Sequence, residues 1–213
     1  MTGKIKLVHS GGNAVSIAVP TSNPSSSEVE FKLPQADGTS GQALVTDASG
    51  NLSFSGTGKI LQVVSTTRTD TFSESLATGT LSADALTVNI TPSNASNKIF
   101  LIAHVSMGLN NDNEVNWVFY KAGSLLTGGA GTADGNRKPR TSAGDVRWTG
   151  THNTTGGQYL DTAGGTSQIT YSVKLGHSAN GTKTVYLNRS HTDDNYAYDV
   201  RTQSTITVME VAA

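Results

Sequence analysis

Apolar and polar residues alternate along most of this chain, and that alternation restricts the fold more than any other feature. In Val15–Val19 every second residue is a large aliphatic one, and four later segments repeat the pattern. Successive side chains of a strand point to opposite faces, so such segments predict half-buried antiparallel strands. The four later segments are Val29–Leu33, Leu52–Ser55, Leu86–Thr91 and Ile169–Leu175.

Further strands and turns follow from apolar runs and from glycine. Ile99–Met107 is apolar on both faces over most of its length, which predicts a central strand. Asp47–Gly50 and Ser178–Gly181 predict four-residue hairpin loops that end in a glycine with positive φ. Only Ser75–Ala85 offers a place for a short helical turn. The remaining predicted strands are Gln42–Thr46, Asn116–Lys121, Lys183–Asn188 and Thr205–Val211.

Composition agrees with a β protein. Thr, Ser, Asn and Gly supply 91 of the 213 residues, charged residues are only 15%, and the net charge is −1. Long surface helices need the Ala, Leu, Glu, Lys and Arg that are sparse here, which excludes helix bundles and coiled coils. The near-zero charge excludes a polyelectrolyte that binds nucleic acid. We therefore expect an all-β fold, a sandwich, jelly roll or small barrel.

The sequence contains no cysteine, which excludes disulfides and thiolate metal sites. No segment approaches the roughly 18 apolar residues of a membrane span. The start, Met1–Lys6, lacks the apolar region of a signal peptide. We expect no membrane insertion and synthesis in a cytoplasm.

The chain is expected to divide near Ser55–Gly58. Residues 1–58 hold short strands joined by Ser-, Pro- and Gly-rich segments, and so short a domain makes a marginal core. This β arm is expected to need a partner. Residues 59–213 are long enough for an independent sandwich, the head, and residues 123–165 are expected to form long loops at one end of it.

No motif for metal binding or catalysis is present. The five histidines lack metal-site spacing, with His104 expected in the core or an interface and the others in turns. Two Asx-rich runs, Asn110–Glu114 and His191–Asn195, lack the residue order of a calcium loop, and turn capping explains them equally well. The sequence shows neither a nucleophile elbow nor a phosphate-binding loop. We expect no cofactor, no metal and no catalytic residue. Sugar cleavage by a carboxylate pair is a weaker alternative, drawn from Asp145, Asp161, Asp193 and Asp194.

Aromatic residues make up only 6% of the chain, so their positions are informative. Three lie on predicted strands and are expected in the core: Trp117, Phe119 and Tyr171. Four others flank Gly- or Asn-rich segments, where rings stack on sugars or anchor protein interfaces, and both alternatives stay open. These four are Trp148, Tyr159, Tyr196 and Tyr198.

A loose basic cluster falls in the expected loop region. It is formed by Arg137, Lys138, Arg140 and Arg147. Such a cluster can meet an acidic polysaccharide or a phosphate group, or it can simply be a solvated loop. Arg137 and Arg140 are therefore candidate contacts to a receptor or interface, together with the four aromatic residues.

Several motifs in this order resemble the fibre proteins of tailed bacteriophages, marine phages in particular. Leu33–Phe54 is similar to their N-proximal repeat, and Gly58–Val64 resembles the start of the β head that follows it. Thr91–Ile99 resembles the loop-to-strand motif of that head. Thr184–Ser190 and Ser204–Ala213 are similar to its C-terminal end.

The resemblance implies a virion structural protein, expected to be a homotrimer. Residues 1–58 would dock on other virion proteins, and the β head would project and contact a polysaccharide or protein of the host surface. The first hypothesis is thus a short fibre or spike. The second is a capsid-decorating head fibre or cement protein that stabilises the shell without binding a receptor.

Overall fold

The computed structural model describes residues 4–18, 22, 24, 28–39, 41–56, 58–148, 150–197 and 199–213. The chain forms two compact units, Met1–Thr57 and Gly58–Ala213, which we call the arm and the head. The prediction of an all-β fold is confirmed, since the one helix among the described residues is the short 3-10 turn η1 (Thr127–Gly129). None of the described helices is long and apolar enough to cross a membrane.

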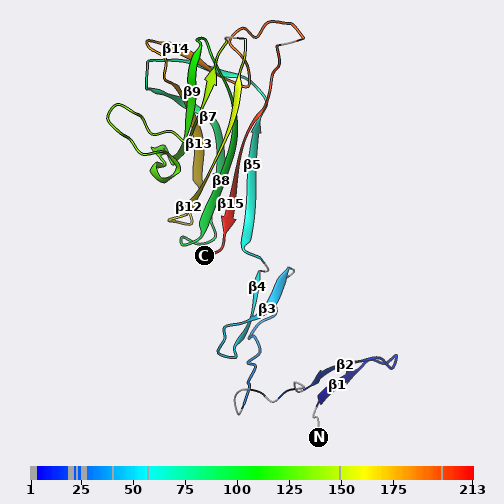
Figure 1. Ribbon diagram of the computed structural model, residues 1–213. Helices are drawn as coiled ribbons and strands as arrows, with labels where there is room; N and C mark the ends of the chain where they lie inside the picture. Colours follow the sequence, from blue (N-terminus) through cyan, green and yellow to red (C-terminus); the bar gives the residue numbers. More distant parts are fainter. Residues whose placement is uncertain are drawn as a thin grey trace. The chain divides into compact units, whose positions relative to one another are not determined.

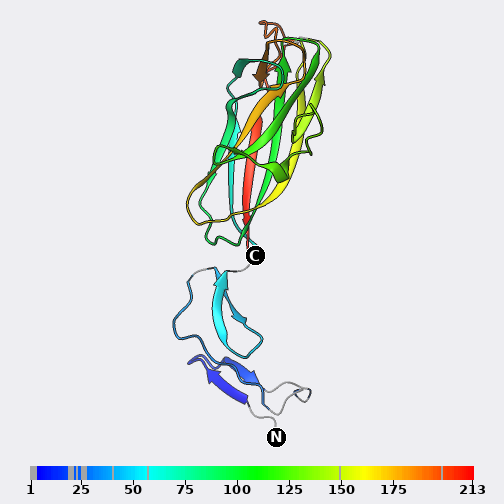
Figure 2. The ribbon, with the colours of Figure 1, turned by 90° about the vertical axis from the view of Figure 1, so that its left-hand side faces the viewer.

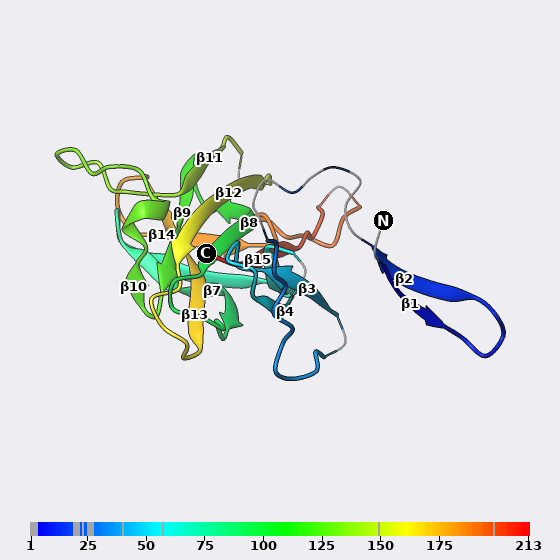
Figure 3. The same cartoon turned by 90° about the horizontal axis from the view of Figure 1, so that it is seen from below.

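The arm consists of two antiparallel hairpins (Figure 3). The strands of the first are β1 (Lys4–Val8) and β2 (Ala14–Ala18), and those of the second are β3 (Gln42–Thr46) and β4 (Leu52–Gly56). The predicted hairpin loop before β4 is confirmed, and Gly50 adopts the expected positive φ of 85°. Of the predicted strand at Val15–Val19, Val19 lies outside the described residues.

The strand predicted at Val29–Leu33 is wrong. Only Lys32 forms a bridge, to Asn51, and Val29, Phe31 and Leu33 are exposed. Alternation correctly identifies an apolar face here, but a strand also needs a partner along its whole length. The arm supplies such a partner at a single residue.

The head is a sandwich of two antiparallel sheets (Figures 1 and 2). The five-stranded sheet has the order β10 (Ser124–Leu125), β9 (Asn113–Lys121), β13 (Ile169–His177) and β7 (Leu81–Ile90). Its fifth strand, β11 (Ser142–Val146), also pairs with β9, so β9 has three neighbours. The six-stranded sheet has the order β5 (Ile60–Arg68), β15 (Ser204–Val211), β8 (Lys98–Leu109), β14 (Lys183–Leu187) and β6 (Phe72–Leu76), with β12 (Asn153–Thr162) also on β8.

The core lies between the two sheets and is built from their inward-facing residues. Trp117, Phe119 and Tyr171 are buried there, as predicted, and the first two rings meet edge to face at a centroid distance of 5.0 Å. Each fully buried side chain of this size stabilises the fold by about 2 kcal/mol. Ile99–Met107 lies within β8, which has neighbours on both edges, so the predicted central strand is confirmed.

Two predictions about connections fail because most links in the head cross between the sheets. Ser178–Gly181 joins β13 to β14, which belong to different sheets, so it is no hairpin loop. A turn motif specifies a local reversal of the chain and leaves the pairing partner open. In the predicted helical turn Ser75–Ala85, residues 78 and 79 form a non-helical turn between β6 and β7.

The predicted loop region 123–165 is also partly wrong, because it contains β11 and the ten-residue strand β12. Every second residue of β12 is partly buried, so the strand has the periodicity of a sheet. Its inward residues are small or polar, and the sequence therefore hides the alternation. They are Asn153, Thr155, Gly157, Tyr159 and Asp161.

Candidate functional site

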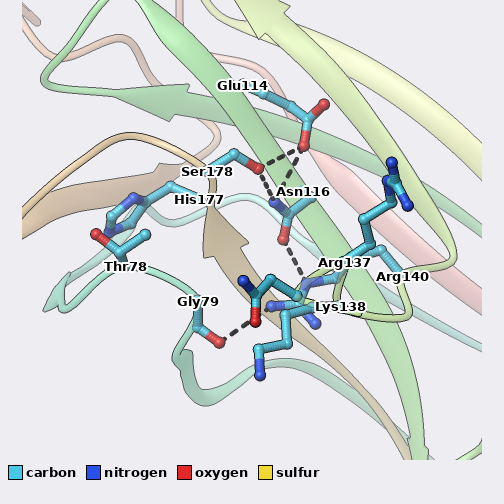
Figure 4. Close-up of a pocket in the computed structure, with 10 residues that line it drawn as sticks. Thr78, Gly79, Glu114, Asn116, Arg137, Lys138, Arg140, His177 and Ser178 are labelled. Atoms are coloured by element: carbon cyan, nitrogen blue, oxygen red, sulfur yellow. Dashed lines mark hydrogen bonds between the residues drawn. The ribbon is translucent and has the colours of Figure 1, made fainter. Parts of the chain in front are cut away.

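A polar pocket of about 370 Å³ lies in the head (Figure 4). Four segments far apart in the sequence supply its walls: the β6–β7 turn, β9, the segment before β11 and the end of β13. The ten lining residues are Thr78, Gly79, Glu114, Asn116, Asn136, Arg137, Lys138, Arg140, His177 and Ser178. Eight of these ten residues carry an amide, hydroxyl, carboxylate or cationic side chain, in addition to His177.

The strand β9 places Glu114 and Asn116 on the same face, opposite to the core face that carries Trp117. Residues two apart in a strand point the same way, which explains why an acidic and an amide side chain meet here. Gly176 pairs with Asn116 across the sheet. A Cβ at Gly176 would lie 2.8 Å from Asn116 Oδ1, so glycine leaves room for this amide.

Hydrogen bonds link four of the lining side chains into one chain (Figure 4). The Ser178 hydroxyl donates to Glu114 Oε1 at 2.7 Å, and Asn116 Nδ2 donates to the same oxygen at 3.4 Å. Arg140 Nε donates to Asn116 Oδ1 at 2.6 Å. Asn116 is buried and uses its amide to connect an anion with a cation, so its orientation is fixed from both sides.

Arg140 and Lys138 supply positive charge without a matching carboxylate. Burial lowers the pKa of Arg140, whereas the charges of Tyr120 and Glu114 raise it. Among the described residues neither Arg140 nor Lys138 forms an ion pair, whereas Arg137 pairs with Asp134. Guanidinium and ammonium groups bind anions strongly. Arg140 also donates to the carbonyl oxygens of Pro139 and Gly79, but no ion pair among the described residues neutralises either cation.

His177 brings a buried acceptor to the pocket wall. Its ring is 1% exposed, and Nε2 lies 2.9 Å from the carbonyl oxygen of Leu76. Because a carbonyl only accepts, we assign the proton of the neutral ring to Nε2, which leaves Nδ1 as an acceptor. Nδ1 has no hydrogen-bond partner among the described residues. A buried acceptor of this kind favours a ligand that donates.

The structure brings together part of the predicted basic cluster. Arg137, Lys138 and Arg140 all line the pocket, while Arg147 is outside it, highly exposed and paired with Asp145. The sequence did not indicate Glu114, Asn116 or His177 as their neighbours. Glu114 lay within the Asx-rich run considered for calcium, and this was the only signal that pointed to the region.

The four predicted aromatic contacts are in different environments. Trp148 and Tyr196 are 61% and 59% exposed, on the segment after β11 and on the segment before β15. Tyr159 differs from the prediction, because its strand turns the ring inward, where it packs against the core. Tyr198 lies outside the described residues. The sequence could not show that Tyr159 belongs to an inward-facing position of a strand.

One histidine prediction is wrong and another is narrowed. His104 is exposed on the outer face of β8 and does not lie in the core, because its neighbours at 103 and 105 take the inward positions; its place in an interface stays a prediction. His177 is not in a turn; it is the last residue of β13 and is buried. The error at His104 arises because β8 is apolar on both faces, so its sequence has no periodicity that identifies the inward residues.

Three of the acidic residues considered for calcium or sugar cleavage, Asp145, Asp161 and Asp193, have local partners. Asp193 accepts hydrogen bonds from Arg201 and Arg189, and these lower its pKa in spite of burial. Asp161 pairs with Lys121 and accepts the Tyr171 hydroxyl at 2.7 Å. In the part of the chain that the structure describes, no group of three or more His, Cys, Asp or Glu side chains could hold a metal ion.

Comparisons with known proteins give no family. No protein-family model and no curated protein sequence matches the chain. Solved structures with some likeness are those of infectious bursal disease virus, Gt strain (TM-score 0.37, 15% identity) and Gx strain (0.36, 15%), and its VP2 subviral particle (0.35, 13%). They match 94–95% of this chain, which spans about half of theirs, 47–48%. The likeness is too distant to assign a function.

Proposed function

We propose that this chain is a non-enzymatic structural protein of a tailed-phage virion, a short trimeric fibre or spike. In this proposal the arm docks on other virion proteins, and the head contacts the host surface. The resemblance of the sequence motifs to phage fibre proteins supports the proposal. The observation that carries it is the contrast in burial between the arm and the head.

The head has a buried apolar core, and the described part of the arm shows none. The buried hydrophobic residues lie at or after Leu76, whereas no residue of Met1–Thr57 whose burial the structure describes is buried. The arm instead leaves large apolar side chains 37–77% exposed: Ile5, Leu7, Val8, Ile17, Val29, Phe31, Leu33, Leu44, Val45 and Phe54. Contiguous exposed apolar surface marks an interaction site, which supports docking through the arm.

Removal of the arm tests the docking role. We expect residues 58–213 to fold, with a cooperative melting transition, because the head has its own core. We also expect this truncated chain to be lost from phage particles during gradient purification, while the full chain stays bound. The assay is quantitative blotting of particles from cells that supply either form. Equal retention of both forms would contradict docking through the arm.

The outer face of the six-stranded sheet offers a surface for self-association. Cross-strand pairing aligns four apolar residues in one row over four neighbouring strands, and Ile102 and Val211 point to the same face on either side of the row. The row consists of Val63 on β5, Met209 on β15, Phe100 on β8 and Leu160 on β12. A second copy of the head is the occupant that the proposed homotrimer requires here.

The double variant Val63→Lys/Leu160→Lys is expected to weaken trimer formation about 100-fold or more, because each ammonium group would lose water in an apolar contact. Sedimentation velocity of the full chain measures this effect. Both side chains are about half exposed, so the fold should be retained.

Thr67→Lys/Thr154→Lys is the matched control, since it places the same charges at exposed positions of the same two strands. This control should sediment like the parent chain. A parent chain that is monomeric at micromolar concentration, or a Val63/Leu160 variant that remains trimeric, would contradict the proposed surface.

Capsid decoration is the second candidate function, and the short connection between the two units favours it. Strand β4 ends at Gly56 and β5 begins at Ile60, so no shaft separates arm from head. So short a connecting segment suits a cement protein that stabilises the shell. The location of the protein on the particle distinguishes the two functions.

A further inference from the structure

We propose that the polar pocket binds a saccharide unit that carries an acidic group, such as a uronic acid. The inference specifies the host-surface contact of the proposed function and rests on it for the source of the ligand. The pocket volume of about 370 Å³ falls in the lower part of the range of small-ligand sites. Its chemistry is divided between a cationic side and a side that accepts hydrogen bonds.

The cationic side selects the acidic group. Arg140 and Lys138 form no ion pair among the described residues. Arg140 is held in place by three bonds to protein oxygens, from Nε to Asn116 Oδ1, from Nη1 to the Pro139 carbonyl at 2.9 Å and from Nη2 to the Gly79 carbonyl at 3.4 Å. Lys138 lies over the same turn, since a Cβ at Gly79 would be 3.7 Å from its Cε. A carboxylate between these two cations would gain charge-assisted hydrogen bonds from both.

The other side selects hydroxyl groups. Both side-chain hydrogen bonds to the Glu114 carboxylate end on Oε1, which leaves Oε2 without a partner among the described residues. His177 Nδ1, buried in the pocket wall, is a second acceptor without a partner among them. Two acceptors next to two cations suit a ligand with an acidic group at one end and hydroxyl donors at the other. A small free anion such as phosphate would gain the cations but would supply fewer hydroxyl donors to the two acceptors than a sugar ring does.

Isothermal titration of the full chain tests this inference with three probes: trigalacturonate, the neutral galactose trimer and inorganic phosphate. We expect trigalacturonate to bind more tightly than the other two and to bind more weakly as ionic strength rises. Lys138→Gln removes a charge-assisted contact, and Arg140→Lys keeps the charge but removes the two-point geometry of the guanidinium group. Each substitution should weaken binding about tenfold.

Arg147→Gln is the matched control, since it removes an exposed arginine outside the pocket and should leave affinity within about twofold. Neutral trimer or phosphate binding as tightly as trigalacturonate would overturn the inference, as would no binding of any probe. Parent-like affinity of both pocket variants would also overturn it. Particle labelling tests the virion role without the pocket, so failure of one proposal is distinguished from failure of the other.

Discussion

Replacement of Glu210 by Gln is expected to lower the free energy of unfolding by about 3 kcal/mol at pH 7. Glu210 lies on the inward face of β15 and is fully buried. Its carboxylate accepts hydrogen bonds from Gln62 Nε2 at 2.6 Å, from Asn97 Nδ2 at 2.7 Å, and from the amide and hydroxyl of Ser93 at 2.7 and 2.8 Å. A Gln amide would turn two of its own hydrogens toward these donors and leave buried groups unpaired.

The same site predicts a dependence of stability on pH. Burial raises the pKa of Glu210, but the bonds from Gln62, Asn97 and Ser93 outweigh burial and bring the pKa to about 2, from an ordinary 4.5. A carboxylate with a lowered folded-state pKa stabilises the protein above pH 4.5, and that contribution is lost as pH falls from 4.5 toward 2. The shift corresponds to about 3 kcal/mol.

Urea unfolding of the parent and the Glu210→Gln variant between pH 7 and pH 2.5 measures both effects. The difference between the two proteins should be largest near neutral pH and should shrink below about pH 4.5. Asp112→Asn, which neutralises an exposed carboxylate, serves as the control and should change stability by less than about 0.5 kcal/mol. A difference that is constant over this pH range would contradict the assigned role of Glu210.

Gly157→Ala is expected to destabilise the head by about 2–3 kcal/mol, whereas Gly156→Ala should change stability by less than about 0.5 kcal/mol. A Cβ at Gly157 would lie 2.7 Å from Trp117 Cη2 and 2.7 Å from Thr141 Cγ2. Trp117 is fully buried, and its Nε1 donates to Thr155 Oγ1 at 2.8 Å, so the ring has no room to move. At Gly156 the added methyl group would face outward, 3.3 Å from the exposed His104 ring.

The two adjacent glycines therefore report which face of β12 is inward. Thermal unfolding followed by near-ultraviolet circular dichroism, which senses Trp117, measures the difference directly. Because a shift of one residue would exchange the two faces of the strand, the register itself is tested. Equal effects at the two positions, or a larger loss at Gly156, would contradict the pairing of β12 with β8.

The sequence predicts strands where hydrophobic periodicity is visible, and the failures have a physical cause. Leu86–Thr91 and Ile169–Leu175 bury large apolar side chains at every second position, and both were predicted. In β12 the inward positions hold residues such as Gly157 and Asp161, and Trp117 of the opposite sheet fills the space over Gly157. The periodicity of β12 alone cannot show that Trp117, from another strand, fills the space at its inward positions.

The pocket was predictable only in part for a related reason. Its cations lie within four residues of one another, so a charge cluster reveals Arg137 and Arg140. Asn116 and His177 come from two different strands, and only the pairing of β9 with β13 brings them to the same place. Sequence spacing carries no information on that pairing, and so neither residue had a signal.

The most direct test of the account is the location of the protein on the virion. An antibody against residues 58–213, labelled with gold and applied to intact phage particles, gives that location by electron microscopy. We predict gold at the tail or its tip, as a short fibre that meets the host requires. Gold spread over the shell would favour capsid decoration instead, and particles without gold would contradict a virion role.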